Sequence, residues 1–443
     1  MCPAANPAST IVVDGPQARK IWNSLLDRPS APGLLSHVIN VGTSWLLDWL
    51  TEEYLAHGLA DGDACFKYVQ GYYGSGKTQF IQSLAARAAR HGIASAVIDV
   101  GQSCPFNSQL AIYQAVMRHL RPPAERGRLA ADEKGIEILV DAWVAQKLAE
   151  RGIEPGHHVS EGVVQELLSH FNVPLSGFPD VQAATAMRLF CRRRVEIAGG
   201  AVDGAQDSVL LAWLRGNQVS DSALKTQGIH EPAKELNAFN RLKTVLGFLR
   251  RFLGSRGFLI AFDEGSRTAS FRRGSTNQEN SVENLLTMCN DVADMEFASV
   301  MFVYSATPDF RSEVVTRYQA LNDRIGNHSV QPGRLETRRR PFIDLDALDT
   351  DSIVLEMGQV LLQIFEAAYS VELPRDIEVA NVRTLLAAEK RQFGIGSEIR
   401  RAFVYHYCAL LEDQKYNGAR VLSAADMEDF IAGRPMAFED EAA

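Results

Sequence analysis

The sequence has no run close to the roughly 20 uninterrupted apolar residues that a transmembrane helix requires, so we expect no membrane span. Its first residues, MCPAANPAST, show no basic segment followed by an apolar one, and no secretory signal is expected. The six cysteines have neither CxxC spacing nor nearby histidine pairs. That pattern argues against a zinc site or a disulfide framework and predicts a reducing, cytoplasmic location.

An excess of positive charge is also lacking, because the formal net charge is −9. A general nucleic-acid binder needs clustered Lys and Arg to contact phosphates, and this composition is not typical of one. Most of the short basic runs are expected to lie on solvated surfaces. If double-stranded DNA is bound, the places to look are the basic loop 266–273 and the run Arg338-Arg339-Arg340.

What the chain does contain is a set of apolar segments that alternate with helical patterns. With 443 residues, 46% of them hydrophobic, it can form two or three domains with real cores. The segments expected to form buried strands are 66–69, 94–100, 258–265, 299–310 and, more weakly, 340–348. Strands that alternate with helices predict an α/β fold with a mostly parallel, doubly wound sheet.

Between these strands lie long regions with helical periodicity only. We expect an N-terminal helical segment at 1–62, an α/β core at 63–345 and a C-terminal helical lid domain at 346–443. Nothing strand-like occurs from 124 to about 256, so this stretch is predicted to be a helical insertion within the core.

The stretch GYYGSGKT, residues 71–78, has the spacing G-x-x-x-x-G-K-[ST] of a phosphate-binding loop. It follows an apolar strand candidate and precedes a helix expected from about Gln79 to Arg90, which is the context that the motif requires. Glycines let successive backbone N–H groups surround an anion, and the helix N-terminus adds its dipole. Lys77 is predicted to reach the β- and γ-phosphates and Thr78 to ligate Mg²⁺. The residues expected to contact ATP here are Gly71, Tyr72, Tyr73, Gly74, Ser75, Gly76, Lys77, Thr78 and Gln79.

A second strand candidate, FLIAFDE, ends in two carboxylates at the sheet edge where ligands bind in open α/β folds. Asp263 is predicted to hold Mg²⁺ through water, and Glu264 to polarise the attacking water. Taken alone, such a pair is more often a solvated strand end. Its combination with the phosphate loop favours a nucleotide site.

Other candidates rest on position alone. Ser305 and Thr307 end the strand in SVMFVYSATP and are suited to sensing a γ-phosphate, although strand-end turn residues look the same. Arg324 is the candidate for an arginine supplied to a neighbouring subunit's γ-phosphate, with Arg317 as the lesser alternative. Arg400 could reach back over the nucleotide from the lid, and Arg401 is the alternative on the same helix.

Together these features resemble the AAA+ superfamily of P-loop NTPases, in its branch related to replication initiators. The order of GYYGSGKTQF, WLRG (213–216), GFLIAFDE, YQALNDRI and RRPFIDLDAL is similar to that of BrxD-type ATP-binding proteins of bacteriophage-exclusion and related methylation-associated defence systems. The similarity covers roughly residues 35 to 430. It implies ATP binding, ATP hydrolysis and work beside other defence proteins.

The chain also departs from that pattern. Thr43 stands where initiator-like ATPases commonly carry Arg, and the polar residues Gly265-Ser266-Arg267 follow the acidic pair. Two functions are weighed: a homo-oligomeric ATPase that acts on DNA or DNA-bound partners, and a nucleotide-dependent switch or scaffold with little turnover. A small-molecule kinase is a third, weaker reading.

Overall fold

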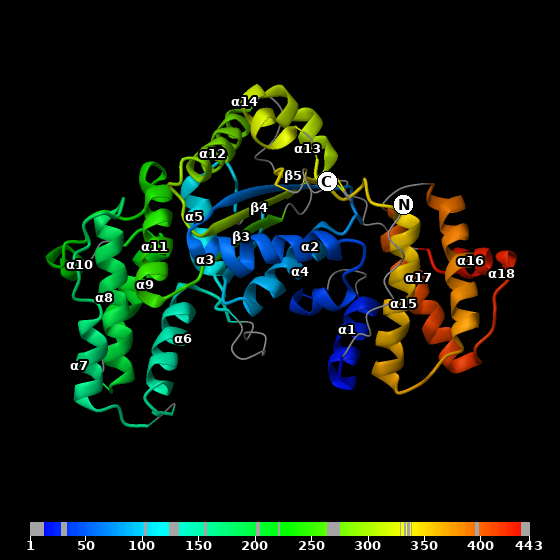
Figure 1. Ribbon diagram of the computed structural model, residues 1–443, viewed down its shortest axis with the longest axis horizontal. Helices are drawn as coiled ribbons and strands as arrows, with labels where there is room; N and C mark the ends of the chain where they lie inside the picture. Colours follow the sequence, from blue (N-terminus) through cyan, green and yellow to red (C-terminus); the bar gives the residue numbers. More distant parts are fainter. Residues whose placement is uncertain are drawn as a thin grey trace.

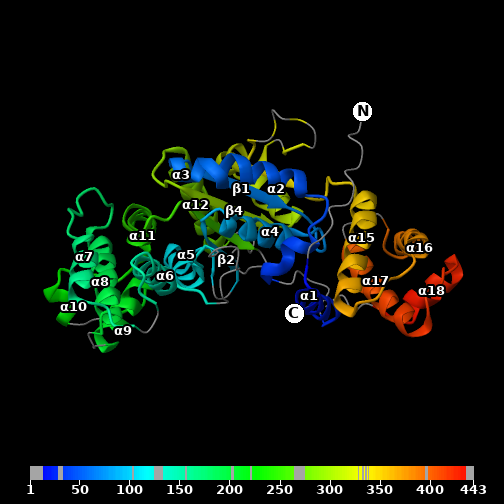
Figure 2. The ribbon, with the colours of Figure 1, turned by 60° about the horizontal axis from the view of Figure 1, so that its bottom comes forward.

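The structure is a computed structural model of the 443-residue chain. It describes residues 13–27, 33–101, 104–123, 133–154, 157–200, 204–219, 222–263, 275–327, 329–331, 334, 337, 339–394 and 398–435. Figure 1 shows a central sheet with a helical lobe on each side, and the turned view in Figure 2 shows the same arrangement. No helix among the described residues has the length and apolar character needed to cross a membrane.

The centre of the molecule is a five-stranded sheet in the order β2-β3-β4-β1-β5, and every pairing is parallel. The strands are β1 (Cys65–Gln70), β2 (Ala94–Asp99), β3 (Phe258–Asp263), β4 (Val300–Ala306) and β5 (Phe342–Asp344). β2 to β5 form within segments that the sequence predicts, and β1 extends the predicted segment 66–69 by one residue at each end, so the α/β prediction is confirmed. All residues of β1, β3 and β4 are buried, as is usual for parallel strands covered on both faces.

Alternate residues of the strands pack into two different hydrophobic cores, one on each face of the sheet. Leu259 and Ala261 face a cluster that contains helices α2 and α4, whereas Ile260 and Phe262 face the opposite cluster. The helices around the first cluster are α2 (Ser44–Leu50), the π-helix η2 (Thr51–Gly58), α3 (Leu59–Asp61) and α4 (Lys77–Arg90). The 3-10 helix η1 (Gly33–Ile39) lies against α4, but its apolar residues pack against the cluster of the C-terminal helices. The elements on or beside the other face are α5 (Gln109–His119), α12 (Thr276–Ala293), α13 (Pro308–Glu313), η5 (Val315–Arg317), α14 (Gln319–Leu321) and η6 (Asn322–Gly326).

The predicted helical stretch between β2 and β3 forms one lobe of Figure 1. It consists of α6 (Ile136–Ala149), α7 (Glu161–Ser169), α8 (Val181–Ala198), α9 (Gly204–Leu214), α10 (Ser222–Thr226), η3 (Glu235–Asn237) and α11 (Ala238–Leu253). Its buried residues belong to the same hydrophobic cluster as one face of the sheet. The lobe is therefore packed as a continuation of the sheet rather than as a separate body.

The WLRG segment fastens this lobe to α5. The Tyr113 hydroxyl donates to the carbonyl of Leu214 at 2.5 Å, and the Gln114 amide donates to the carbonyl of Gly216 at 2.8 Å. Gly216 has a φ of +81°, and a Cβ there would lie 2.9 Å from the Gln114 side chain. Trp213 is fully buried, with the Arg241 guanidinium 4.1 Å from its ring centroid. These contacts give the segment a structural role.

The other lobe joins the two ends of the described chain. It contains α1 (Gly15–Asp27), α15 (Thr350–Tyr369), α16 (Arg375–Phe393), α17 (Glu398–Asn417) and α18 (Ala424–Ala432). Trp22 of α1 is fully buried, packs edge-on against Phe365 at 4.9 Å and donates to Glu412 at 2.7 Å. The N-terminal helical segment thus contributes to two cores, because α1 packs here while α2 to α3 pack on the sheet.

Candidate nucleotide-binding site

The glycine-rich loop lies between β1 and α4, at the carboxyl edge of the sheet. Gly74 and Gly76 have φ values of +80° and +94°, a backbone conformation that residues other than glycine rarely adopt. Helix α4 begins at Lys77, two residues earlier than the sequence predicts, so the lysine occupies its first turn. The loop therefore leads directly into a helix N-terminus, which favours anions through its free N–H groups and dipole.

The side chain of Lys77 lies within this loop. Its ammonium donates to the carbonyl oxygens of Gly71 at 2.6 Å and Tyr72 at 3.2 Å, and lies 5.3 Å from the centre of the Tyr73 ring. The residue is only 7% exposed. The cation is held where a phosphate bound by the loop would meet it.

A chain of hydrogen bonds connects three of the predicted site residues. The Thr78 hydroxyl donates to one Asp263 carboxylate oxygen at 2.6 Å, and the Ser305 hydroxyl donates to the other at 2.5 Å. Asp263 and Ser305 are register partners on β3 and β4, and β4 lies between β1 and β3. The sheet order therefore brings the ends of three strands together at the loop.

These groups fit a magnesium ion. Mg²⁺ prefers oxygen ligands and is usually held by one or two carboxylates together with waters and substrate phosphates. The Thr78 hydroxyl donates its proton to Asp263, so this bond does not occupy the oxygen lone pairs of Thr78. These lone pairs can coordinate a cation. The described residues hold no group of three or more His, Cys, Asp or Glu able to bind a metal by themselves. The phosphates of a nucleotide would have to complete the coordination.

Asp99 is a neighbouring carboxylate that the sequence prediction missed. It ends β2 and pairs in register with Asp263. Burial, and then the nearby Asp263 charge, raise the pKa of Asp99 above its usual value. The signal was present in the sequence, since AVIDV also places an acidic residue at a strand end.

The loop is also held from the side of β5. Asp346, just beyond β5, accepts from the backbone N–H of Tyr72 at 2.9 Å. Arg400 of α17 donates to the carbonyl of Ser75 at 3.0 Å. The Gln79 amide donates to the carbonyl of Ser36 in η1. Asp346 was missed by the sequence prediction, although it lies within the fifth strand candidate, 340–348, as its second acidic residue.

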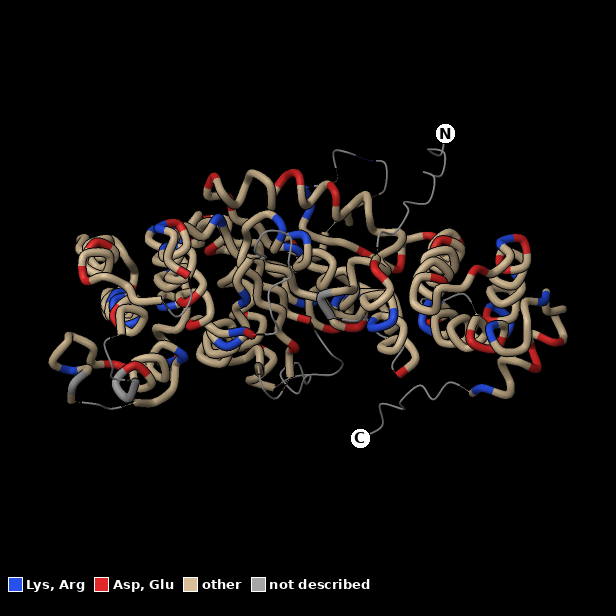
Figure 3. Tube along the Cα trace, turned by 90° about the horizontal axis from the view of Figure 1, so that it is seen from below, with Lys and Arg blue, Asp and Glu red and all other residues tan. Residues whose placement is uncertain are grey.

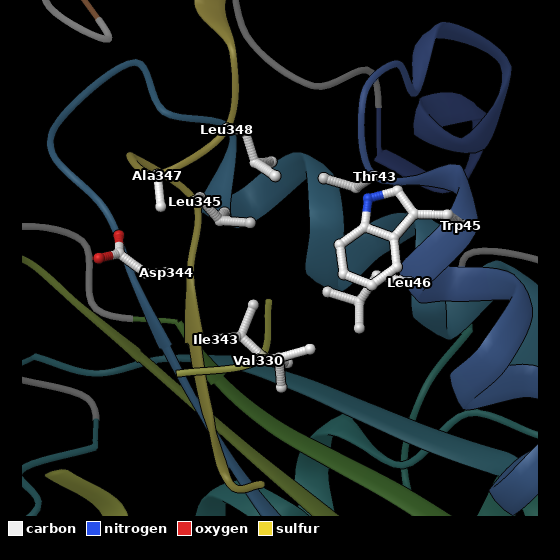
Figure 4. A pocket seen from close by; sticks show the side chains of 9 residues that line it. All are labelled: Thr43, Trp45, Leu46, Val330, Ile343, Asp344, Leu345, Ala347 and Leu348. Atoms are coloured by element: carbon white, nitrogen blue, oxygen red, sulfur yellow. The ribbon is translucent and has the colours of Figure 1, made fainter. Parts of the chain in front are cut away.

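A small pocket opens on this same side (Figure 4). Its walls include Thr43 and Trp45 from the start of α2 and Leu345 and Leu348 from the segment after β5. The Thr43 hydroxyl donates to Asn40 at 2.8 Å.

Among the described residues, the candidates Thr307, Arg317 and Arg324 form no hydrogen bond with Asp263. Thr307 is the N-cap residue of α13, where its side chain makes no capping hydrogen bond. Arg324 is exposed in η6, and its Nε donates to Asn290 of α12 at 3.1 Å. Arg317 is exposed at the end of η5. Glu264 lies outside the described residues, as do the loop 266–273 and Arg338.

The loop geometry predicts the effect of Gly71→Ala. A Cβ at this position would lie 2.1 Å from the Ser75 hydroxyl oxygen and 2.7 Å from its Cβ, so the loop must shift. We expect the affinity for Mg-ATP to fall about tenfold, or about 1.4 kcal/mol, in titration calorimetry. Thermal unfolding without nucleotide should change little, because the displaced groups lie at the loop. Gly101→Ala is the matched control, since nothing lies within 4 Å of a Cβ there. An unchanged ATP affinity in Gly71→Ala would contradict the close packing of this loop.

The model of the family "BREX system ATP-binding protein BrxC/D" matches residues 16–420. The chain belongs to this family. The resemblance predicted from the motifs is thereby confirmed, and this BrxC/D-family protein is an ATP-binding component of BREX anti-phage systems. The matched range includes the glycine loop, Asp263, Arg324, Arg400 and the whole helical lobe between β2 and β3. No curated protein matches the chain.

Proposed function

We propose that this BrxC/D-family protein is a magnesium-dependent ATPase that works as a homo-oligomer. The observation that carries the proposal is the hydrogen-bonded chain from Thr78 through Asp263 to Ser305, which begins at the residue after the buried Lys77. It joins the phosphate loop to the carboxylate at the end of β3. A loop that served only as a turn would not require this connection.

In this proposal each group has one task. Lys77 neutralises the β- and γ-phosphates, while Thr78 and Asp263 hold the magnesium ion, which stabilises charge on the phosphates when bound. Glu264 orients the attacking water and accepts its proton. Ser305 fixes the orientation of the Asp263 carboxylate through the hydrogen bond to its second oxygen.

Arg324 is proposed to act in the active site of a neighbouring subunit. Its exposed side chain is bound to Asn290 of α12, rather than to the loop of its own chain. An exposed arginine on a short turn beyond the end of β4 can be presented to another copy. There it would stabilise negative charge that develops on the γ-phosphate.

Mixing two inactive variants tests this proposal. Glu264→Gln should abolish hydrolysis while ATP binding survives, and Arg324→Ala should lower hydrolysis with little effect on binding. In a mixed oligomer, some sites combine Glu264 of one copy with Arg324 of another, so the 1:1 mixture should recover part of the wild-type steady-state rate. Glu264→Gln mixed with the double variant Glu264→Gln, Arg324→Ala is the control, because no subunit in that mixture carries the water-activating carboxylate and no activity should return. A mixture as inactive as Glu264→Gln alone would contradict action across an interface.

Two finer parts of the proposal concern partners and location. Acidic and basic positions are interspersed along the described chain in Figure 3, and Arg339 is paired with Glu53 at 2.5 Å. We therefore propose contact with DNA-bound defence proteins first, and direct DNA contact at 266–273 and 338–340 second. Direct contact would weaken steeply with salt in a duplex-binding assay.

A protein that binds ATP but hydrolyses none, with or without duplex DNA, would instead be a nucleotide-dependent switch. A cytoplasmic location stays a prediction.

A further inference from the structure

Arg400 of the C-terminal lobe is buried between the lobe and the glycine loop. It is 4% exposed. One terminal nitrogen donates to the carbonyls of Ser75 at 3.0 Å and Leu345 at 3.3 Å. The other donates to the carbonyl of Leu348 at 3.2 Å and the hydroxyl of Thr350 at 3.1 Å. A single side chain thus connects the loop, the segment after β5 and the start of α15.

These four bonds use the terminal N–H groups of the guanidinium. A guanidinium has five N–H donors, of which four belong to the two terminal nitrogens. The fifth, on Nε, is buried and has no hydrogen-bond partner among the described residues. Only the single Nε–H remains for a phosphate, because contact through either terminal nitrogen would first break the bonds described above.

The segment after β5 holds the loop through further contacts of its own. The Leu345 backbone N–H donates to the carbonyl of Gln70 at 2.9 Å, and Asp346 accepts from the Tyr72 N–H at 2.9 Å. Arg400 therefore binds both the loop and the segment that holds it. Because the Arg400 guanidinium is rigid and planar, a shift of the Ser75 carbonyl would also move the part of the C-terminal lobe that carries Arg400.

We propose that Arg400 is a positioning residue that ties the C-terminal lobe to the glycine loop through the Ser75 carbonyl, and that it does not read the γ-phosphate. The proposal rests on the nucleotide site proposed at Gly71–Thr78. It makes a specific distinction: a residue that reads the γ-phosphate favours ATP over ADP, whereas one that shapes the loop affects both nucleotides equally. The backbone of the glycine loop is expected to surround the phosphates that ATP and ADP have in common.

The experiment is calorimetric binding of Mg-ATP and Mg-ADP in the Glu264→Gln background, which prevents turnover. Arg400→Ala should weaken both nucleotides by a similar factor, about tenfold. The ratio of the two affinities should stay within about threefold of the parent. Hydrogen exchange of the backbone amides at 72–76 should become faster without nucleotide. Loss of ATP affinity alone, with loop exchange unchanged, would overturn the proposal, and so would unchanged affinity for both nucleotides.

Three controls separate this role from general loss of stability. Arg401→Ala, on the same helix, should leave both affinities and loop exchange unchanged. Tyr407→Phe removes a buried hydrogen bond of 3.0 Å to Glu378 within the lobe and should lower the melting temperature without changing the affinities. Arg400→Lys keeps the charge but cannot make the planar set of contacts, so it should show the same losses of affinity, and it is the variant to measure if Arg400→Ala does not fold. If the parent itself binds neither nucleotide, the site proposal fails before Arg400 is tested.

Discussion

Replacing Lys77 by Met should weaken the binding of Mg-ATP at least about 100-fold, a loss of about 2.7 kcal/mol. The methionine has nearly the same length and apolar stem, so the fold should survive. What is lost is the buried cation that lies within the loop, bound to the carbonyls of Gly71 and Tyr72. Without it, the negative charge of the β- and γ-phosphates is offset only by backbone N–H groups and the metal ion.

Titration calorimetry with the Lys77→Met variant measures this loss directly. Arg90→Met is the matched control, because it removes one positive charge from the exposed last turn of the same helix, α4. The control should bind ATP as the wild type does. Melting temperatures of the two variants without ATP should agree within a few degrees. Tight ATP binding by Lys77→Met would mean that the nucleotide does not bind at this loop.

Replacing Asp263 by Asn should lower the rate of ATP hydrolysis at least about 100-fold, or about 2.7 kcal/mol of transition-state stabilisation. The carboxylate accepts from the hydroxyls of both Thr78 and Ser305. An amide has one acceptor oxygen and no negative charge, so it can neither accept both bonds nor attract Mg²⁺ as strongly. The Mg²⁺ concentration that gives half-maximal turnover should therefore rise.

Steady-state assays over a range of Mg²⁺ concentrations test this result. Ser305→Ala provides the graded comparison, because it removes one hydrogen bond from the same carboxylate and leaves its charge in place. We expect its effect to be about tenfold, smaller than that of Asp263→Asn. Equal effects of the two substitutions would show that the orientation of the carboxylate, rather than its charge, dominates. A fully active Asp263→Asn variant would exclude this residue from the metal site.

The strands and the loop could be predicted from sequence because their signals are local. A run such as FLIAFD is buried on both faces, and GYYGSGKT needs its glycines whatever surrounds it. The order of the strands is a different matter, since it depends on which faces pack together. The placement of β4 between β1 and β3 is what brings Ser305 to Asp263, and no local pattern reports it.

Long-range contacts explain what the sequence could not show. Asp346 and Arg400 bind the loop across 274 and 325 positions of the chain. Both residues look like ordinary charged side chains in their own segments. The sequence could predict Arg400 as a lid residue, but its binding to a carbonyl of the loop follows only from the packing of α17 against the segment after β5. Glu264 lies outside the described residues, and its role stays a prediction.

The packing of α1 against α15 and α17 has a consequence for synthesis of the protein. Ribosomes add about 5–20 residues per second, so Trp22 waits roughly 20–80 s before its partner helices leave the exit tunnel. During that interval α1, an amphipathic helix with a large aromatic side chain, has no partner helix to cover its apolar face. We expect ribosome-associated chaperones to cross-link there, and expression of the C-terminal lobe without residues 13–27 to yield aggregated protein.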